Sequence, residues 1–308
     1  MMTGQRIFCI GETVLDIIFK NDLPVTANPG GSMLNTAVSL GRAGLPVFFI
    51  SEYGTDHAGN LIAEFLEKNG VSTDYVNRYS NGKTALALAF LDHEQDAEYS
   101  FYKLFPAERL EAPFPDVNNR DIVLFGSIYA IADPVYKVIR DFVRTAKSRG
   151  AFIIYDPNFR NAHLAELETL KPRIVENISL ANLVRGSDED FRNIFNAADS
   201  SEAFQFVNQA GCPFLIYTQS SNFVQVYAHG SSQYYEVPRV NVLSTVGAGD
   251  AFNAGVIYEL FFRPWSENFP ETIQAGLIGS GIRFSAEVCG SMDNYISVAF
   301  GEKLKITP

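Results

Sequence analysis

Short apolar runs alternate with amphipathic segments along most of the chain. An apolar run closed by glycine, proline or polar residues is typical of a buried strand. Such runs occupy residues 6–10, 47–51, 121–127, 151–157, 182–187, 213–219, 222–229 and 233–238. Segments with helical spacing of apolar residues lie at 32–44, 60–70, 134–149, 250–262 and 270–287. This alternation predicts an α/β fold with three layers, in which helices cover both faces of a mostly parallel sheet.

The alternation is interrupted over residues 71–105. Here "TALALAFLD" (84–92) and "AEYSFYK" (97–103) are joined by the polar "HEQDA", with no helix between them. Two strand-like runs around a polar connection predict a β-hairpin. The insertion is too small to fold alone, so we expect one domain over 1–308 with a small β-sheet lid, to which residues 11–30 are a candidate contributor.

Composition narrows the class of protein. The 308 residues include 47% apolar residues, enough for a large core, and the net charge is −11. That charge argues against non-specific nucleic-acid binding, although it leaves room for a local basic pocket. No apolar run reaches a membrane-spanning length, the N-terminus lacks a secretory signal pattern, and three distant cysteines indicate free thiols. We therefore expect a cytoplasmic protein without membrane or nucleic-acid partners.

The stretch "STVGAGDAFNAG" (244–255) carries the first candidate chemistry. Gly247 and Gly249 flank Ala248, and Asp250 follows where a helix begins. Glycines before a helix N-terminus let an anion approach unpaired amides, and a carboxylate placed there can accept a proton. The alternative interpretation is that Asp250 is an ordinary helix N-cap.

A second glycine pair opens a helix in "NPGGSMLNTAVSLGRAG" (28–44). Gly30 and Gly31 precede it, Asn35 lies in its first turn, and Asp16 follows the first strand in "GETVLD". Carboxylate, amide and bare backbone suit a ligand with many hydroxyls, because each hydroxyl both donates and accepts. Alternatively, Asp16 could be a solvated surface acid, and Asn35 could be a helix-cap partner. The carboxyl ends of parallel strands, where ligands collect, hold Gly11, Glu12, Asp156, Ser187 and Thr218.

These residues resemble a known family. "GGSMLNTA" followed by "LGRAG", together with "TVGAGDAFNAG", looks like the two signatures of the PfkB/ribokinase-like carbohydrate kinases, and "YDPNFR" (155–160) is similar to a stretch of the fructokinase and 2-keto-3-deoxygluconate kinase branches. The resemblance covers almost the whole chain. It implies ATP as phosphoryl donor with Mg²⁺, a monovalent cation such as K⁺ as a further candidate, and a homodimer formed through the lid.

The resemblance also implies roles for individual residues. Asp250 matches the catalytic base, and Gly247, Ala248 and Gly249 match the anion hole. Asp16, Gly31 and Asn35 match positions that hold the sugar, with Gly11 and Gly30 beside them. Arg160 lies where the branch often carries an arginine on the substrate or phosphate side.

The sequence departs from the family pattern on the nucleotide side. Ser244 stands where the family usually has aspartate, and the Asn-x-x-Glu motif appears as Ser187 and Asp190. Asp190 keeps the negative charge and is the candidate metal-associated residue, acting through water. The nucleotide loop keeps Thr218 but has Ser220 and Phe223 in place of glycines.

These features lead to two hypotheses. The first is an ATP-dependent sugar kinase, with fructose as the favoured substrate and 2-keto-3-deoxygluconate or ribose as alternatives. Phe101 or Tyr102 and Lys103 would reach the sugar from the lid, although strand aromatics often serve packing or dimer contacts and a strand-end lysine is often solvated. The second hypothesis is a non-catalytic sugar-binding relative with a degraded nucleotide site.

Overall fold

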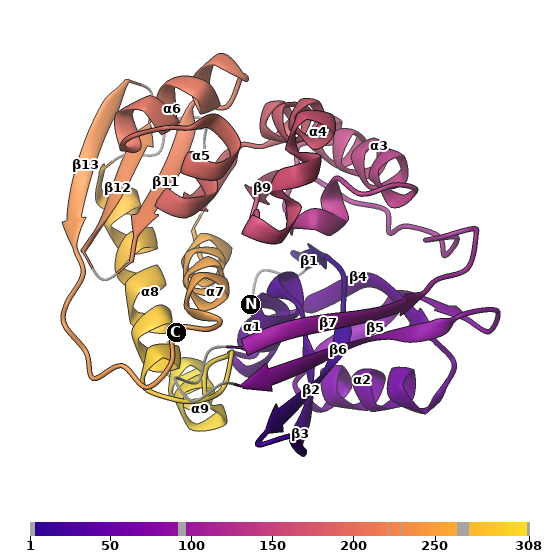
Figure 1. The fold of residues 1–308 in the computed structure, drawn as a ribbon. Coiled ribbons are helices and arrows are strands. Elements are labelled where there is room, and N and C mark those ends of the chain that lie inside the picture. Colours follow the sequence, from indigo (N-terminus) through magenta and orange to yellow (C-terminus); the bar gives the residue numbers. More distant parts are fainter. Residues whose placement is uncertain (1–3, 92–96, 221, 229, 264–270, 307–308) are drawn as a thin grey trace.

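The computed structural model describes residues 4–91, 97–220, 222–228, 230–263 and 271–306, and these form two β-sheets flanked by helices (Figure 1). The central sheet contains β1 (Ile7–Ile10), β4 (Val47–Gly54), β5 (Val71–Tyr79), β8 (Ile122–Gly126), β9 (Phe152–Asp156), β10 (Leu183–Ser187), β11 (Phe214–Gln219), β12 (Phe223–Ala228) and β13 (Ser231–Glu236). Their order is β13-β12-β11-β10-β9-β8-β1-β4-β5. Neighbouring strands are parallel from β5 through to β11. β12 pairs antiparallel with β11, and β13 pairs antiparallel with β12.

Helices cover both faces of this sheet, because successive strand residues point to opposite sides. In β1, Ile7 and Cys9 join one buried cluster, whereas Phe8 and Ile10 join the other. The first cluster packs against α1 (Ser32–Arg42), α2 (His57–Lys68), α7 (Ala248–Phe261), α8 (Glu271–Cys289) and α9 (Val298–Ile306). The second packs against α3 (Val135–Ser148), α4 (Leu167–Leu180), α5 (Asp188–Phe195) and α6 (Ser200–Gln209). Short 3₁₀ helices lie at Ile128–Ala130 and Asn161–Glu166. The predicted three-layer α/β/α fold is confirmed.

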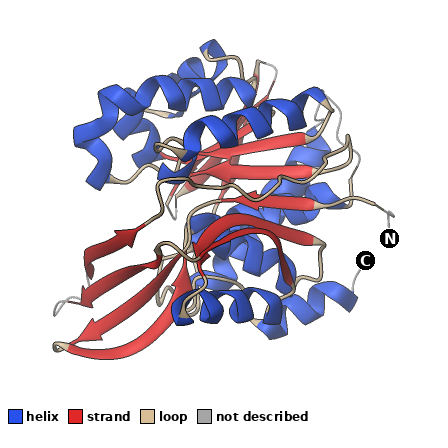
Figure 2. Cartoon of the chain, turned by 90° about the vertical axis from the view of Figure 1, so that its right-hand side faces the viewer, coloured by secondary structure: helices blue, strands red, loops and turns tan. Residues whose placement is uncertain are grey.

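The second sheet is small and has the strand order β3-β2-β6-β7. It consists of β2 (Val14–Lys20), β3 (Leu23–Gly30), β6 (Lys83–Leu91) and β7 (Ala97–Leu104). Figure 2 shows this sheet extending away from the layered core. Its position beside the core is compatible with a lid, which stays a prediction.

The insertion expected over 71–105 is divided between the two sheets. Residues 71–79 form β5, which pairs in parallel with β4 at the edge of the central sheet, because Val71 and Val76 complete its apolar core. Only β6 and β7 reach the small sheet, where they join β2 and β3 from the N-terminal part. Most of the polar "HEQDA" connection lies outside the described residues.

No helix in the described part of the chain has the length and apolar character needed to cross a membrane. All three cysteines are free thiols, and Cys9 and Cys212 are buried as the apolar context predicts.

Candidate active site

The N-terminus of α7 presents two backbone amides beside a buried carboxylate. Gly247 precedes the helix with φ 79°, and a side chain there would collide with the backbone of Asn294. The Ala248 amide donates to the Thr245 carbonyl oxygen at 3.2 Å. Within the described chain the next two amides, those of Gly249 and Asp250, have no hydrogen-bond partner, so they are the donors available to an anion.

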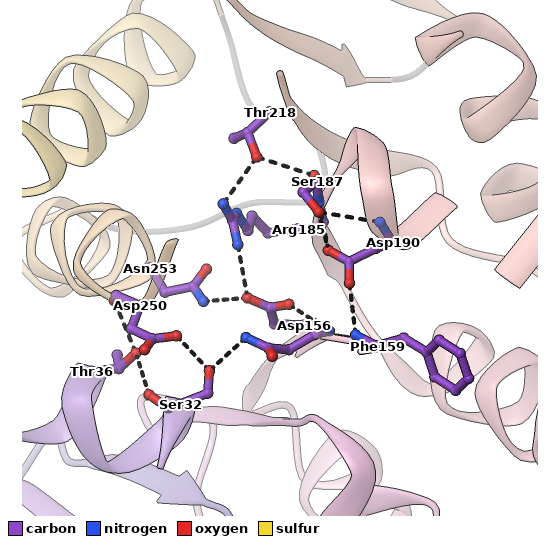
Figure 3. Close-up of polar contacts among 12 residues, drawn as sticks. Ser32, Thr36, Asp156, Phe159, Arg185, Ser187, Asp190, Thr218, Asp250 and Asn253 are labelled. Atoms are coloured by element: carbon purple, nitrogen blue, oxygen red, sulfur yellow. Dashed lines mark hydrogen bonds and ion pairs between the residues drawn. The ribbon is translucent and has the colours of Figure 1, made fainter. Parts of the chain in front are cut away.

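Asp250 does not cap its own helix, although its position allowed that interpretation. The helix has no side-chain cap hydrogen bond, and the Asp250 carboxylate turns instead toward α1. Its Oδ1 accepts from Ser32 Oγ at 2.5 Å, and its Oδ2 accepts from Asn35 Nδ2 at 2.9 Å. The Thr36 hydroxyl donates to the Asp250 carbonyl oxygen at 2.9 Å. Three polar side chains of α1 therefore hold both the carboxylate and the backbone of the first turn of α7. Figure 3 shows two of them, Ser32 and Thr36, beside Asp250.

Two glycines bring α1 to this position. Gly31 precedes the helix with φ 137°, and a side chain there would meet the carbonyl oxygen of Glu12 at the end of β1. At Gly11 a side chain would overlap Met33, whose own side chain is buried under the sheet. Bare backbone at both positions lets the start of α1 lie directly against the end of β1.

Burial raises the pKa of the Asp250 carboxyl above its usual range, and this is the largest effect on it. The hydrogen bonds from Ser32 and Asn35 oppose the shift, as do the positive charges of Arg160 and Arg185. A carboxylate with a raised pKa is a stronger base than an exposed one. Asp250 is therefore suited to accept a proton from a hydroxyl brought against it.

A buried network joins the ends of β9, β10 and β11 to α7. The Asp156 Oδ2 atom accepts from Arg185 Nη1 at 3.1 Å and from Asn253 Nδ2 at 2.6 Å. The second guanidinium nitrogen, Arg185 Nη2, donates to Thr218 Oγ1 at 2.9 Å. Asn158 connects this network to α1, because its side chain donates to Ser32 Oγ at 2.9 Å.

The candidate metal-associated residue Asp190 is held by protein donors. It forms a capping box with Ser187 at the start of α5, and its Oδ1 accepts from the Phe159 amide at 2.6 Å. Its Oδ2 accepts from the Ser187 amide at 2.8 Å and from the Ser187 hydroxyl at 2.6 Å. Burial, followed by the charge of Asp156, raises its pKa. Both carboxylate oxygens are thus engaged, an arrangement compatible with contact to an ion through water.

Ser244 and Ser220, two other residues that differ from the family pattern on the nucleotide side, make local contributions to the backbone conformation. The Ser244 hydroxyl accepts from the Val246 amide at 3.2 Å, which stabilises the turn that leads to the glycine loop. Ser220 lies at the exposed end of β11 with a left-handed φ of 43°, a conformation that glycine adopts without strain.

The small sheet brings its own candidate residues together on one face. Asp16, Ala87 and Phe101 are direct partners across β2, β6 and β7, so their side chains point to the same side. Lys103 shares that face by the two-residue period of the strand. It binds Glu12 at the end of β1, with Nζ 2.7 and 2.8 Å from the two carboxylate oxygens. Tyr102 points to the opposite face.

Asp16 is half-buried, not a solvated surface acid. One of its carboxylate oxygens occupies the space where a side chain at position 30 would stand, so Gly30 makes room for it. No hydrogen bond ties the carboxylate to any other described residue. Burial raises the pKa of Asp16 to about 7. An acceptor with free lone pairs thus lies next to the glycine pair that opens α1.

The structure brings most of the candidate residues to one region, and it adds others. Arg160 is exposed and has no ion pair with another described residue, but its charge acts on Asp250. Four residues of the site were not predicted from the sequence: Ser32, Asn158, Arg185 and Asn253. For Arg185 a signal existed, because it is a lone charge in an otherwise apolar strand.

Comparisons with known proteins identify the family of the chain. Residues 5–277 match the pfkB family carbohydrate kinases, and the chain belongs to that family. It is 27% identical over 267 residues to the probable chloroplastic fructokinase-6 of Arabidopsis thaliana, covering 82% of this chain and 70% of that one. It is 21% identical to aminoimidazole riboside kinase of Salmonella typhimurium, covering 84% and 82%.

Solved structures share the fold. The aminoimidazole riboside kinase of Salmonella enterica, complexed with aminoimidazole riboside and an ATP analog, superimposes with a TM-score of 0.84 at 19% identity, covering 98% of this chain and 99% of that one. The ATP-bound fructokinase of Xylella fastidiosa superimposes with a TM-score of 0.80 at 24% identity, covering 97% of each chain.

We predict that Asp16→Asn raises the melting temperature at pH 8 by several degrees. The buried carboxylate costs stability above its pKa of about 7, and that cost disappears as pH falls toward the unfolded-state value near 4. The gain should therefore shrink steadily between pH 7 and pH 4 in thermal denaturation scans. Asp22→Asn, at an exposed position in the neighbouring turn, is the matched control. A gain that is absent at pH 8, or equal at every pH, contradicts the prediction.

Proposed function

We propose that this protein transfers the γ-phosphoryl group of ATP to a hydroxyl of a neutral sugar, with fructose as the favoured acceptor. The observation that carries the proposal is the start of α7, where a buried carboxylate and two open amides lie side by side. A base for the attacking hydroxyl and donors for the transferred charge are what in-line phosphoryl transfer needs.

In the proposed reaction Asp250 accepts the proton of the sugar hydroxyl as its oxygen bonds to the γ-phosphorus. The bond between that phosphorus and the bridging oxygen of ADP breaks, and ADP leaves with the electron pair. The amides of Gly249 and Asp250 donate to the phosphoryl oxygens while charge develops on them. Ser32 and Asn35 fix the carboxylate so that its orientation is set before the substrate arrives.

The sugar would lie between Asp250 and the small sheet. Asp16 offers an unbound carboxylate, and Phe101 presents a ring on the same face. The Asn35 Oδ1 atom is buried without a hydrogen bond, so a ligand hydroxyl would satisfy it. Closure of the small sheet would exclude water, which otherwise competes for the phosphoryl group.

ATP would approach from the ends of β10 and β11, near Thr218 and Ser220. Mg²⁺ usually keeps several waters and binds through few carboxylates together with substrate phosphates, so we propose that it arrives with ATP and meets Asp190 through water. It would neutralise phosphate charge there. The exposed, unpaired Arg160 is the proposed contact for an oxygen of the phosphoryl group or the sugar.

The Glu12–Lys103 pair favours a neutral acceptor. An acidic sugar such as 2-keto-3-deoxygluconate needs a cation for its carboxylate, and Glu12 already neutralises the lysine of the lid face. Fructose, ribose and aminoimidazole riboside carry no such group. Among the relatives, fructokinases recur, including that of Vibrio alginolyticus at 22% identity over 94% of this chain, which supports fructose.

The first experiment is ADP formation from ATP–Mg²⁺ with fructose, ribose, 2-keto-3-deoxygluconate and aminoimidazole riboside, for the wild type and for Asp250→Asn. We expect turnover with fructose, and a loss of about 10²–10⁴-fold in the variant, the size typical of general-base catalysis. Sugar should still raise the melting temperature of the variant, because binding does not need the base.

A different set of results would support the second hypothesis, a sugar-binding protein without catalytic activity. If no sugar is phosphorylated, and sugars raise the melting temperature while ATP–Mg²⁺ does not, the protein binds sugar without catalysis. Repeating the active reaction with K⁺ replaced by Na⁺ tests the monovalent cation, which the relative from Vibrio cholerae holds in its potassium-bound structure.

We predict that Glu12→Gln raises the preference for 2-keto-3-deoxygluconate over fructose by about tenfold, because the freed Lys103 ammonium can pair with the substrate carboxylate. The pair is partly exposed and so contributes little to stability, and the melting temperature should change little. The ratio of the two kcat/KM values measures the effect. The double variant with Lys103→Met should lose the gain. An unchanged ratio in Glu12→Gln would show that Lys103 does not face the acceptor.

We also propose that the outer face of the small sheet forms a homodimer contact. Phe90, Tyr102 and Leu104 share this face and are 37%, 59% and 64% exposed. Light scattering should give twice the chain mass of 34.1 kDa. Tyr102→Glu should yield the monomer, whereas Tyr234→Glu, on the edge strand β13 of the other sheet, should not. A wild-type monomer at micromolar concentration contradicts this contact.

A further inference from the structure

Arg185 is a buried cation under the region where the proposed transfer occurs. It is 7% exposed, and it is the only charged residue of β10, whose other side chains are apolar or small. Its two terminal nitrogens bind Asp156 and Thr218, as described above. Its Nε is buried and has no hydrogen-bond partner among the residues that the structure describes. Burying a charged guanidinium costs free energy of folding, and the ion pair with Asp156 offsets only part of that cost.

The guanidinium lies directly against the anion-hole loop. A Cβ atom placed on Gly249 would stand 2.9 Å from Arg185 Nη1 and 3.2 Å from Nη2. Gly249 therefore leaves the space that the guanidinium fills, on the turn whose amides are open. The Arg185 Cζ atom also lies 5.5 Å from the centre of the Phe252 ring, and Phe252 follows Gly249 by about one turn of α7.

The charges around this point explain why a cation is needed. Asp156, Asp190 and Asp250 are all buried, and the positive charge of Arg185 favours the ionised form of both Asp190 and Asp250. The chain as a whole has a net charge of −11. A triphosphate brought close to three buried carboxylates meets repulsion unless a fixed positive charge lies close by.

We propose that Arg185 is a positioning residue for phosphoryl transfer, holding the first turn of α7 and supplying the fixed positive charge beneath its two open amides. The inference rests on the proposed kinase activity. Arg185 acts through Gly249, Asp156 and Thr218 without touching the substrate. Its effect should therefore be larger on the transition state, in which charge has developed on the phosphoryl oxygens, than on bound substrates.

Arg185→Met tests this, with Arg185→Lys as the conservative variant. We expect Arg185→Met to lower kcat on the order of 10–100-fold, the cost typical of a misplaced active-site group, while KM for the sugar changes less than threefold. Arg185→Lys keeps the charge but can bind only one of the two partners well, so it should recover part of kcat. Arg6→Met, which breaks the Arg6–Asp121 pair at the opposite end of β1, should lower the melting temperature without changing kcat.

A second readout separates positioning from stability. ADP–Mg²⁺ with aluminium fluoride and sugar imitates the transferred phosphoryl group. We expect Arg185→Met to weaken binding of this mixture at least tenfold more than it weakens binding of ADP–Mg²⁺ alone. If Arg185→Met has a lower melting temperature but keeps kcat and its affinity for both ADP–Mg²⁺ mixtures, the inference is overturned and Arg185 has only a structural role. The proposed function would stand in that case, since wild-type turnover and its loss in Asp250→Asn test it separately.

Discussion

The site depends on the contact between the first turns of α1 and α7. Each helix follows a glycine with positive φ, and the two meet through the hydrogen bonds that Ser32, Asn35 and Thr36 make with Asp250. These bonds join residues more than 200 positions apart, and they keep a carboxylate ionisable in a buried place. The amides of one helix and the carboxylate it carries are thereby aimed at the same space, which is also where the ends of the parallel strands open.

The parallel sheet explains why the chemistry collects at this edge. The ends of β9, β10 and β11 contribute Asp156, Arg185 and Thr218, which lie on neighbouring strands, so the Arg185 guanidinium reaches both of its partners. The small sheet contributes the residues proposed to hold the sugar, and it is linked to the core by the Glu12–Lys103 pair. In the proposed reaction the layered core would thus carry the transfer chemistry, and a separate, less buried sheet would carry the acceptor side.

Much of this was predictable from the sequence, because its signals are local. Glycines before a helix and a carboxylate in its first turn identify Asp250 and the loop 247–249, and strand–helix alternation identifies the three-layer fold. The assignment of residues 71–79 failed because nothing local distinguishes an edge strand of the central sheet from a strand of the insertion. Pairing between distant segments also decides which polar side chains meet. For that reason the sequence indicated neither the Ser32–Asp250 bond, nor the Asn158–Ser32 bond, nor the partners of Arg185.

If the buried Asp250 accepts the proton of the sugar hydroxyl, kcat at saturating sugar and ATP–Mg²⁺ must depend on the ionisation of this carboxyl, so the pH profile of kcat is the measurement to make. The carboxylate must be ionised to act, so kcat should fall tenfold per pH unit on the acidic side. Because burial raises the pKa of Asp250, this fall should begin above the range of an exposed aspartate. A kcat that stays constant down to pH 4, or an acidic fall that persists in the residual activity of Asp250→Asn, would contradict the account.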